Sequence, residues 1–221
     1  MAQRTLSLTD PLKFSKDMLK FLAIHINDTI KKAKRDIEQD AGFVIDKHLR
    51  QSPEIIDLQK GDLRGHMGLR PGQAAAAVNS IISSVTSTVA VNQKSIQLRS
   101  GKSASVLDIE VQPSSFQNIV NIPQSTISYY SIRYKKTVNL KWLEWLLFQG
   151  DRIVVSDFYF EAGSKGRSGA GKMKERKGSY WRVPPYYSGT VNDNFITRAF
   201  SGTAFQKDME NAIVSNIERY W

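Results

Sequence analysis

The sequence contains no cysteine in 221 residues, which excludes disulfides, thiolate metal sites and a cysteine nucleophile. No apolar run approaches the roughly 18–20 residues that a helix needs to cross a bilayer. Charges also interrupt the opening segment MAQRTLSLTDPLKFSKD, which lacks the apolar core of a signal peptide. We therefore expect a protein without a membrane partner that is made, and used or assembled, in the cytoplasm.

Acidic residues are scarce relative to basic ones. The chain has 21 Asp and Glu against 31 Lys and Arg, a net charge of +10. Such an excess favours a polyanionic partner, although a generally basic protein without one is the simpler alternative. The hydrophobic content of 41% and the charged content of 24% are ordinary for a globular protein and exclude wholesale disorder.

Catalytic motifs are also missing. The three histidines, His25, His48 and His66, are scattered without metal-ligand spacing, and no G-x-S-x-G elbow occurs. The acids of one predicted strand alternate, but a solvated or salt-bridged edge is favoured over a catalytic cluster; they are Asp151, Asp157 and Glu161. We therefore predict no enzyme, no cofactor and no metal.

Residues 163–185, GSKGRSGAGKMKERKGSYWRVPP, come close to a phosphate-binding loop, G-x-x-x-x-G-K-[ST]. Gly166, Gly171 and Lys172 fit the motif, but Met173 stands where a hydroxyl would bind magnesium. A working loop also needs a helix after the lysine, and Gly178 followed by two prolines interrupts that stretch. The motif is therefore not a nucleotide site.

The same stretch predicts a basic β-hairpin, flexible because of its glycines and serines, and then a rigid anchor. Its six candidate contact residues are Lys165, Arg167, Lys172, Lys174, Arg176 and Lys177. Phosphate contacts from such a loop would be independent of sequence and sensitive to salt, and a solvated loop tip is the equal alternative. The aromatics beside Pro184 and Pro185 suit rigid packing better than base stacking.

Apolar spacing predicts a long N-terminal helix that starts near Thr9–Pro11 and is bent or divided at Gly42. One stripe of it is apolar, and the other face is basic around residues 31–35, which is a binding surface or, more simply, a solvated face. A short helix follows Ser52, and another covers Ala74–Ile82.

From Ser84 to Ser131 the short β-branched segments predict an antiparallel sheet. Asn139 should then cap a helix with two tryptophans, and residues 151–162 should form a central strand. Asp193 and Thr203 should open the last two helices. The fold class is therefore α+β, an antiparallel sheet flanked by helices. Residues 1–83 form a helical region and 84–221 the α+β core, together one structural unit.

The C-terminal half resembles the neck and tail-completion proteins (head–tail connectors and minor tail proteins) of tailed bacteriophages. The resemblance is carried by Ser168–Met173, Trp181–Pro185, Ser188–Thr190 and Asp193–Ala199, and by DLRGHMGL at Asp62–Leu69. It extends from about residue 40 to the C-terminus. The lysine-rich hairpin and the long basic helix depart from the pattern, and both could instead face an acidic partner ring.

The resemblance implies a non-enzymatic virion protein, assembled in the bacterial host cytoplasm as a sixfold or twelvefold homo-oligomeric ring around the DNA passage. Its partners would be other neck or tail proteins, and its basic hairpin would line the lumen, touching genomic DNA non-specifically, or reach a neighbouring subunit. The packing or intersubunit anchor would be Trp181, Arg182, Pro184, Pro185, Asn194, Phe195 and Arg198. The position in the neck (adaptor, stopper, tail terminator or sheath-linked ring) stays open. The alternative is a stand-alone, sequence-independent nucleic-acid-binding protein.

Overall fold

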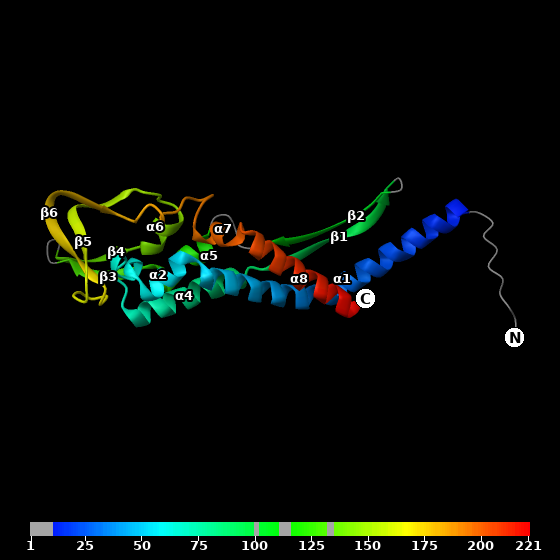
Figure 1. Ribbon diagram of the computed structural model, residues 1–221, viewed down its shortest axis with the longest axis horizontal. Coiled ribbons are helices and arrows are strands. Elements are labelled where there is room, and N and C mark those ends of the chain that lie inside the picture. Colours follow the sequence, from blue (N-terminus) through cyan, green and yellow to red (C-terminus); the bar gives the residue numbers. More distant parts are fainter. Residues whose placement is uncertain (1–10, 100–101, 111–115, 132–134) are drawn as a thin grey trace.

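The computed structural model describes residues 11–99, 102–110, 116–131 and 135–221. Figure 1 shows an elongated molecule with a packed end, the head, and a long helical extension, the arm. We define the head as the described part of residues 45–89 and 116–200, and the arm as the described part of residues 15–44, 90–110 and 203–221. The α+β class is confirmed by helices that alternate with antiparallel strand pairs.

The predicted N-terminal helix is one continuous element, α1 (Pro11–Gln51). The expected start at Thr9 and Asp10 lies outside the described residues. Gly42 does not divide the helix, because α1 continues through it for nine more residues to Gln51. The buried stripe advances by three or four residues, as a helix with one covered face requires: Ile30, Ala33, Ile37, Ala41, Ile45 and Leu49.

Short helices follow α1 and build one wall of the head: α2 (Pro53–Lys60), α3 (Asp62–His66) and α4 (Pro71–Thr86). The predicted helix over Ala74–Ile82 is thus confirmed and longer. Ser52 precedes α2 as expected, but its hydroxyl donates back to the Leu49 carbonyl at 2.8 Å and does not cap the helix.

The strands form three separate two-stranded antiparallel sheets rather than one sheet. They pair β1 (Ala90–Arg99) with β2 (Lys102–Glu110), β3 (Ile127–Ser131) with β4 (Lys136–Leu140), and β5 (Ile153–Ala162) with β6 (Gly171–Arg182). The expectation that residues 151–162 form a central strand is wrong, since β5 has one strand neighbour, β6. The apolar residues of β5 meet helices instead of flanking strands.

Three further elements complete the head: α5 (Gln117–Val120), the 3-10 turn η1 (Pro123–Ser125) and α6 (Trp142–Leu147). Asn139 does not cap α6, because it lies in β4 and its side chain accepts from Ser128 across the strand pair at 2.7 Å. Trp142 is fully buried and donates its indole N–H to the Gln124 carbonyl at 2.8 Å. Trp142 therefore belongs to the core of the head.

The last two helices are α7 (Phe195–Phe200) and α8 (Thr203–Tyr220). The N-cap of α7 is Asn194, one residue beyond the predicted Asp193, and its Oδ1 accepts from the amides of Ile196 and Thr197. Helix α8 turns back along α1, and in Figure 1 the first turns of α1 extend beyond its C-terminal end.

Candidate functional site: a basic hairpin, its anchor and a hollow

The loop between β5 and β6 is packed onto the head. Arg167 donates from Nε to the Gly68 carbonyl at 3.1 Å, and the buried Ser168 hydroxyl donates to the Gly171 carbonyl at 3.3 Å. Gly166 has φ +105°, and a β-carbon there would lie 2.3 Å from the Gly171 carbonyl oxygen. Glycine at position 166 therefore permits a close approach of two backbone segments.

The strand pair rests on α3 through aromatic contacts. The His66 ring stacks on Phe160 with centroids 4.0 Å apart, and Trp181 Nε1 donates to His66 Nδ1 at 3.0 Å. An indole nitrogen can only donate, so His66 Nδ1 must carry a lone pair. Burial lowers the pKa of His66 from 6.5, against the opposing charges of Asp62 and Asp57. The neutral ring is therefore part of the joint between hairpin and head.

Halfway along the hairpin, one residue of β5, Asp157, lies opposite four residues of β6, Arg176–Ser179. We call these four residues the bulge. Asp157 has φ +62°, and its carboxylate accepts the Gly178 amide at 2.8 Å. Because a non-glycine residue in the left-handed region is uncommon and costs free energy, this conformation must be held by its surroundings. The bulge turns Arg176 and Lys177 out to solvent.

The structure separates the six predicted basic residues. Five are exposed: Lys165, Arg167, Lys172, Arg176 and Lys177. The sixth, Lys174, is half-buried and pairs with Glu161 on β5, a hydrogen bond that raises the pKa of Lys174. Lys174 is therefore engaged within the hairpin, and the other five are its outward-facing cations.

The two acids of β5, and Asp151 just before it, make contacts inside the hairpin as well. Asp151 accepts from Arg182 at 2.9 Å, Asp157 holds the bulge, and Glu161 pairs with Lys174. The predicted salt-bridged edge is confirmed at both ends of the strand. Among the described residues, no group of three or more His, Asp or Glu side chains could hold a metal ion.

The predicted anchor residues divide into a buried set and an outer set. Trp181, Asn194 and Phe195 are buried, while Arg182, Pro184 and Arg198 are half-buried and Pro185 is exposed. Gly189 lies inside this segment, and a β-carbon there would lie 2.0 Å from the Leu146 carbonyl oxygen. The chain after the hairpin is thus pressed directly against α6.

Arg198 ties the anchor to α2. Its Nη2 and Nε lie 2.7 and 3.2 Å from the same oxygen, Oε1, of Glu54, whose side chain is 5% exposed. Its Nη1 also donates to Asp193 at 2.9 Å. A carboxylate that is so buried needs such a partner, because an unpaired buried charge costs several kcal/mol.

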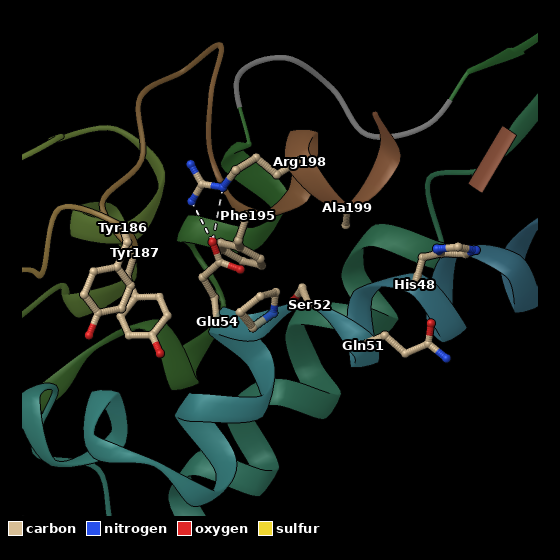
Figure 2. A pocket seen from close by; sticks show the side chains of 10 residues that line it. His48, Gln51, Ser52, Glu54, Tyr186, Tyr187, Phe195, Arg198 and Ala199 are labelled. Carbon is tan, nitrogen blue, oxygen red and sulfur yellow. Dashed lines mark hydrogen bonds and ion pairs between the residues drawn. The ribbon is translucent and has the colours of Figure 1, made fainter. Parts of the chain in front are cut away.

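A hollow of about 500 Å³ opens beside this ion pair. Figure 2 shows Glu54 and Arg198 at its centre, Phe195 behind them and two tyrosines, Tyr186 and Tyr187, at one side. Burial and a hydrogen bond to Asp57 raise the pKa of Tyr187. The hydroxyl of Tyr187 therefore stays protonated and fixes this wall of the hollow to α2.

Sequence reasoning missed four residues of this site: Glu54, His66, Asp157 and Gly65. In the sequence, Glu54 is an acid in the first turn of a short helix, and His66 is one of three scattered histidines. Neither position indicates a contact with the hairpin or its anchor. Gly65 leaves room for the hairpin, since a β-carbon there would lie 2.8 Å from Phe160 Cζ. Its place within DLRGHMGL was the available signal, because that segment carries part of the resemblance.

No protein-family model, no curated protein and no solved structure matches this chain. In the part of the chain that the structure describes, no helix is long and apolar enough to cross a membrane. The residues and their arrangement are therefore the grounds for a functional proposal.

Proposed function

We propose that the protein is a non-enzymatic structural subunit of a phage neck or tail end, and that its copies assemble into a ring around the DNA passage of the virion. The resemblance of the C-terminal half supplies the class of protein. The observation that carries the proposal is an uncovered apolar surface at the free end of α1.

Apolar side chains on this end of α1 lie open to solvent. Phe21 is 69% exposed, Ile24 is 62% exposed, and Met18 is also exposed. Trp221 is 61% exposed and packs edge-on against His25 at 4.8 Å, next to the same surface. Contiguous exposed apolar surface marks protein–protein contact. We call it the apolar end of the arm.

The anchor segment supports a structural role in a second way. Trp181, Asn194, Phe195 and Arg198 hold the hairpin, α6 and α2 together by packing, capping and an ion pair. These are the residues that carry the resemblance, and their contacts serve architecture. A rigid head with an apolar arm suits a subunit that meets neighbours at two places.

The molar mass of the purified protein tests the ring, by light scattering and by negative-stain images. We expect a closed oligomer, and the double change Phe21→Asp with Ile24→Asp should leave single chains. The matched control is Lys32→Asp, exposed on the same helix, which should keep the oligomer. A wild-type chain that is monomeric at all concentrations and absent from purified virions would contradict the proposal.

The exposed cations favour a second candidate, stand-alone nucleic-acid binding without sequence preference. Lys165, Lys172, Arg176 and Lys177 all face solvent on one hairpin. Reversing these four charges to Glu should weaken binding strongly, and it should reduce the salt dependence of the residual binding by about one unit of slope for each lost phosphate contact. Reversal of Lys31, Lys32 and Lys34 on α1 is the control. Binding that survives the hairpin reversal would remove this candidate.

A further inference from the structure

The hollow beside α7 contains a carboxylate oxygen without a partner. Arg198 donates twice to Oε1 of Glu54, whereas Oε2 receives no hydrogen bond from the described residues. The Glu54 side chain is only 5% exposed and lines the hollow, and Figure 2 shows its carboxylate below the Arg198 guanidinium and beside the Phe195 ring. Oε2 is not among the fully buried atoms without a partner, so it is open to solvent and can accept a hydrogen bond from a donor that enters the hollow.

The charges around the hollow are negative in excess, although the chain as a whole carries +10. Arg198 is shared by Glu54 and Asp193, and Asp57 lies behind Tyr187, whose hydroxyl it binds. Two carboxylates, Glu54 and Asp193, thus share one guanidinium. Asp208, near His48 at the far edge, is already paired with Lys47. The unbalanced charge favours a cation.

The wall of the hollow suits a cation as well. Tyr186 is 70% exposed, and its ring lies 4.2 Å from that of Tyr187 at an interplanar angle of 57°. Aromatic faces attract guanidinium and ammonium groups, most strongly where a site is partly shielded from water. An exposed tyrosine face next to an open carboxylate oxygen is a site for a basic side chain.

We propose that this hollow receives Arg176 or Lys177 from the bulge of a second copy. The bulge has the complementary properties: its two cations face solvent, and the carboxylate beside them, Asp157, is committed to the Gly178 amide. Bulge and hollow are different surfaces of one chain, so the contact is head-to-tail. Head-to-tail contacts form rings when the rotation closes. The inference rests on the proposed ring and names one of its interfaces.

The absence of native cysteine permits a direct test. One protein carries Lys177→Cys, which leaves Arg176 in the bulge, and another carries Gln51→Cys on the rim of the hollow, both at exposed positions. The mixture is treated with a short bismaleimide linker. We expect a linked product of two chains. The control replaces the first protein by Lys165→Cys, which is exposed on the same hairpin but outside the bulge, and should give little product.

The oligomeric state of the unlinked proteins separates the two proposals. A ring without preferential linking of positions 177 and 51, or with equal linking of 165, overturns the bulge-to-hollow contact and leaves the ring intact. Single chains without any product overturn both. Preferential linking in an oligomer supports both.

A mixing experiment tests the direction of the contact. Arg176→Glu with Lys177→Glu removes the bulge surface, and Tyr186→Ala removes the wall of the hollow without a change in the core. Each variant alone should need a roughly tenfold higher concentration to form rings. A mixture keeps one intact bulge and one intact hollow, so it should yield two-chain complexes. Rings that form normally from either variant would overturn the inference.

Discussion

The head and the arm are held together by very different amounts of buried apolar surface. Among the described residues, the head core contains 25 buried apolar side chains, drawn from α1, α2, α4, α6, the anchor and the connecting segments. The arm core contains three, Ala33, Ile37 and Val91, with Ile213 and Ile217 packed beside them. Free energy from burial scales with apolar area, so the head is the stable part of the chain.

Hydrogen bonds contribute a larger share of the contacts that hold the arm together. Asn216 donates to Asp40 at 2.6 Å, Tyr220 donates to Asp36 at 2.9 Å, and the Val91 amide donates to Glu38 at 3.1 Å. Such contacts contribute about 1 kcal/mol each at most when water competes for them. The arm can therefore deform at a lower cost in free energy than the head, which holds the hairpin and the hollow in fixed positions.

The largest expected effect is a cavity in the head. Leu146 is fully buried on α6, where Gly189 presses against its carbonyl. Leu146→Ala should lower the free energy of unfolding by about 3 kcal/mol, through lost burial and the cavity left behind. Urea unfolding followed by tryptophan fluorescence measures it. Val191→Ala, at an exposed site, is the control and should change stability by less than about 0.5 kcal/mol.

The matched change in the arm is Ile37→Ala, which is equally buried. The substitution should lower the free energy of unfolding of the arm by about 2 kcal/mol. The loss should be confined to the arm, because few other buried residues stabilise the arm core. Amide hydrogen exchange should show lost protection in α8 and β1 with the head unchanged. Equal loss of protection in the head would show that head and arm unfold together and would remove the comparison.

The parts of the fold that sequence reasoning found are those with local signals. The 3.6-residue stripe of α1 and the helix start at Thr203 depend on neighbours in the chain, and the structure confirms both. The prediction of one antiparallel sheet was wrong, because a β-branched segment does not specify the strand with which it pairs. β5 is apolar on both faces, yet it contacts α3 in addition to its one strand partner, β6. Burial against a helix and burial in a sheet leave the same pattern.

The candidate site was found only in part for a related reason. The cations of the hairpin lie close together in the sequence and are easily seen. The bulge, in contrast, depends on the register of two strands, which puts Asp157 opposite four residues. The hollow needs Glu54 and Arg198, separated by 144 positions. No local pattern brings such residues together.

The next largest expected effect is a loss of stability at low pH, at the contact of His66 with the hairpin. His66 accepts from Trp181 in its neutral form, and burial lowers its pKa from 6.5. The unfolded chain therefore binds a proton more readily than the folded one, so this stabilisation is fully present above pH 6.5 and is lost as the pH falls from 6.5 through the lower pKa of the folded state. Urea midpoints at about pH 7.5 and about pH 5.5 measure the loss.

His66→Gln is the control for this titration, since its amide oxygen can accept from Trp181 and does not titrate. The difference between the two midpoints should shrink in this variant. If wild type and variant lose the same stability on acidification, other groups cause the effect, and the joint between hairpin and head is not pH-dependent.

The smallest effect concerns one polar contact of the arm. Asn216 is fully buried on α8, and its Nδ2 donates to Asp40 and to the Ala212 carbonyl, while its Oδ1 has no partner within the described residues. Asn216→Ala removes the two hydrogen bonds but also the unsatisfied oxygen, so the net loss should be about 1 kcal/mol. Hydrogen exchange at the C-terminal end of α8 measures it, with Asn211→Ala at an exposed site of the same helix as the control. An effect as large as that of Ile37→Ala would mean that polar contacts, rather than the thin apolar stripe, hold the arm together.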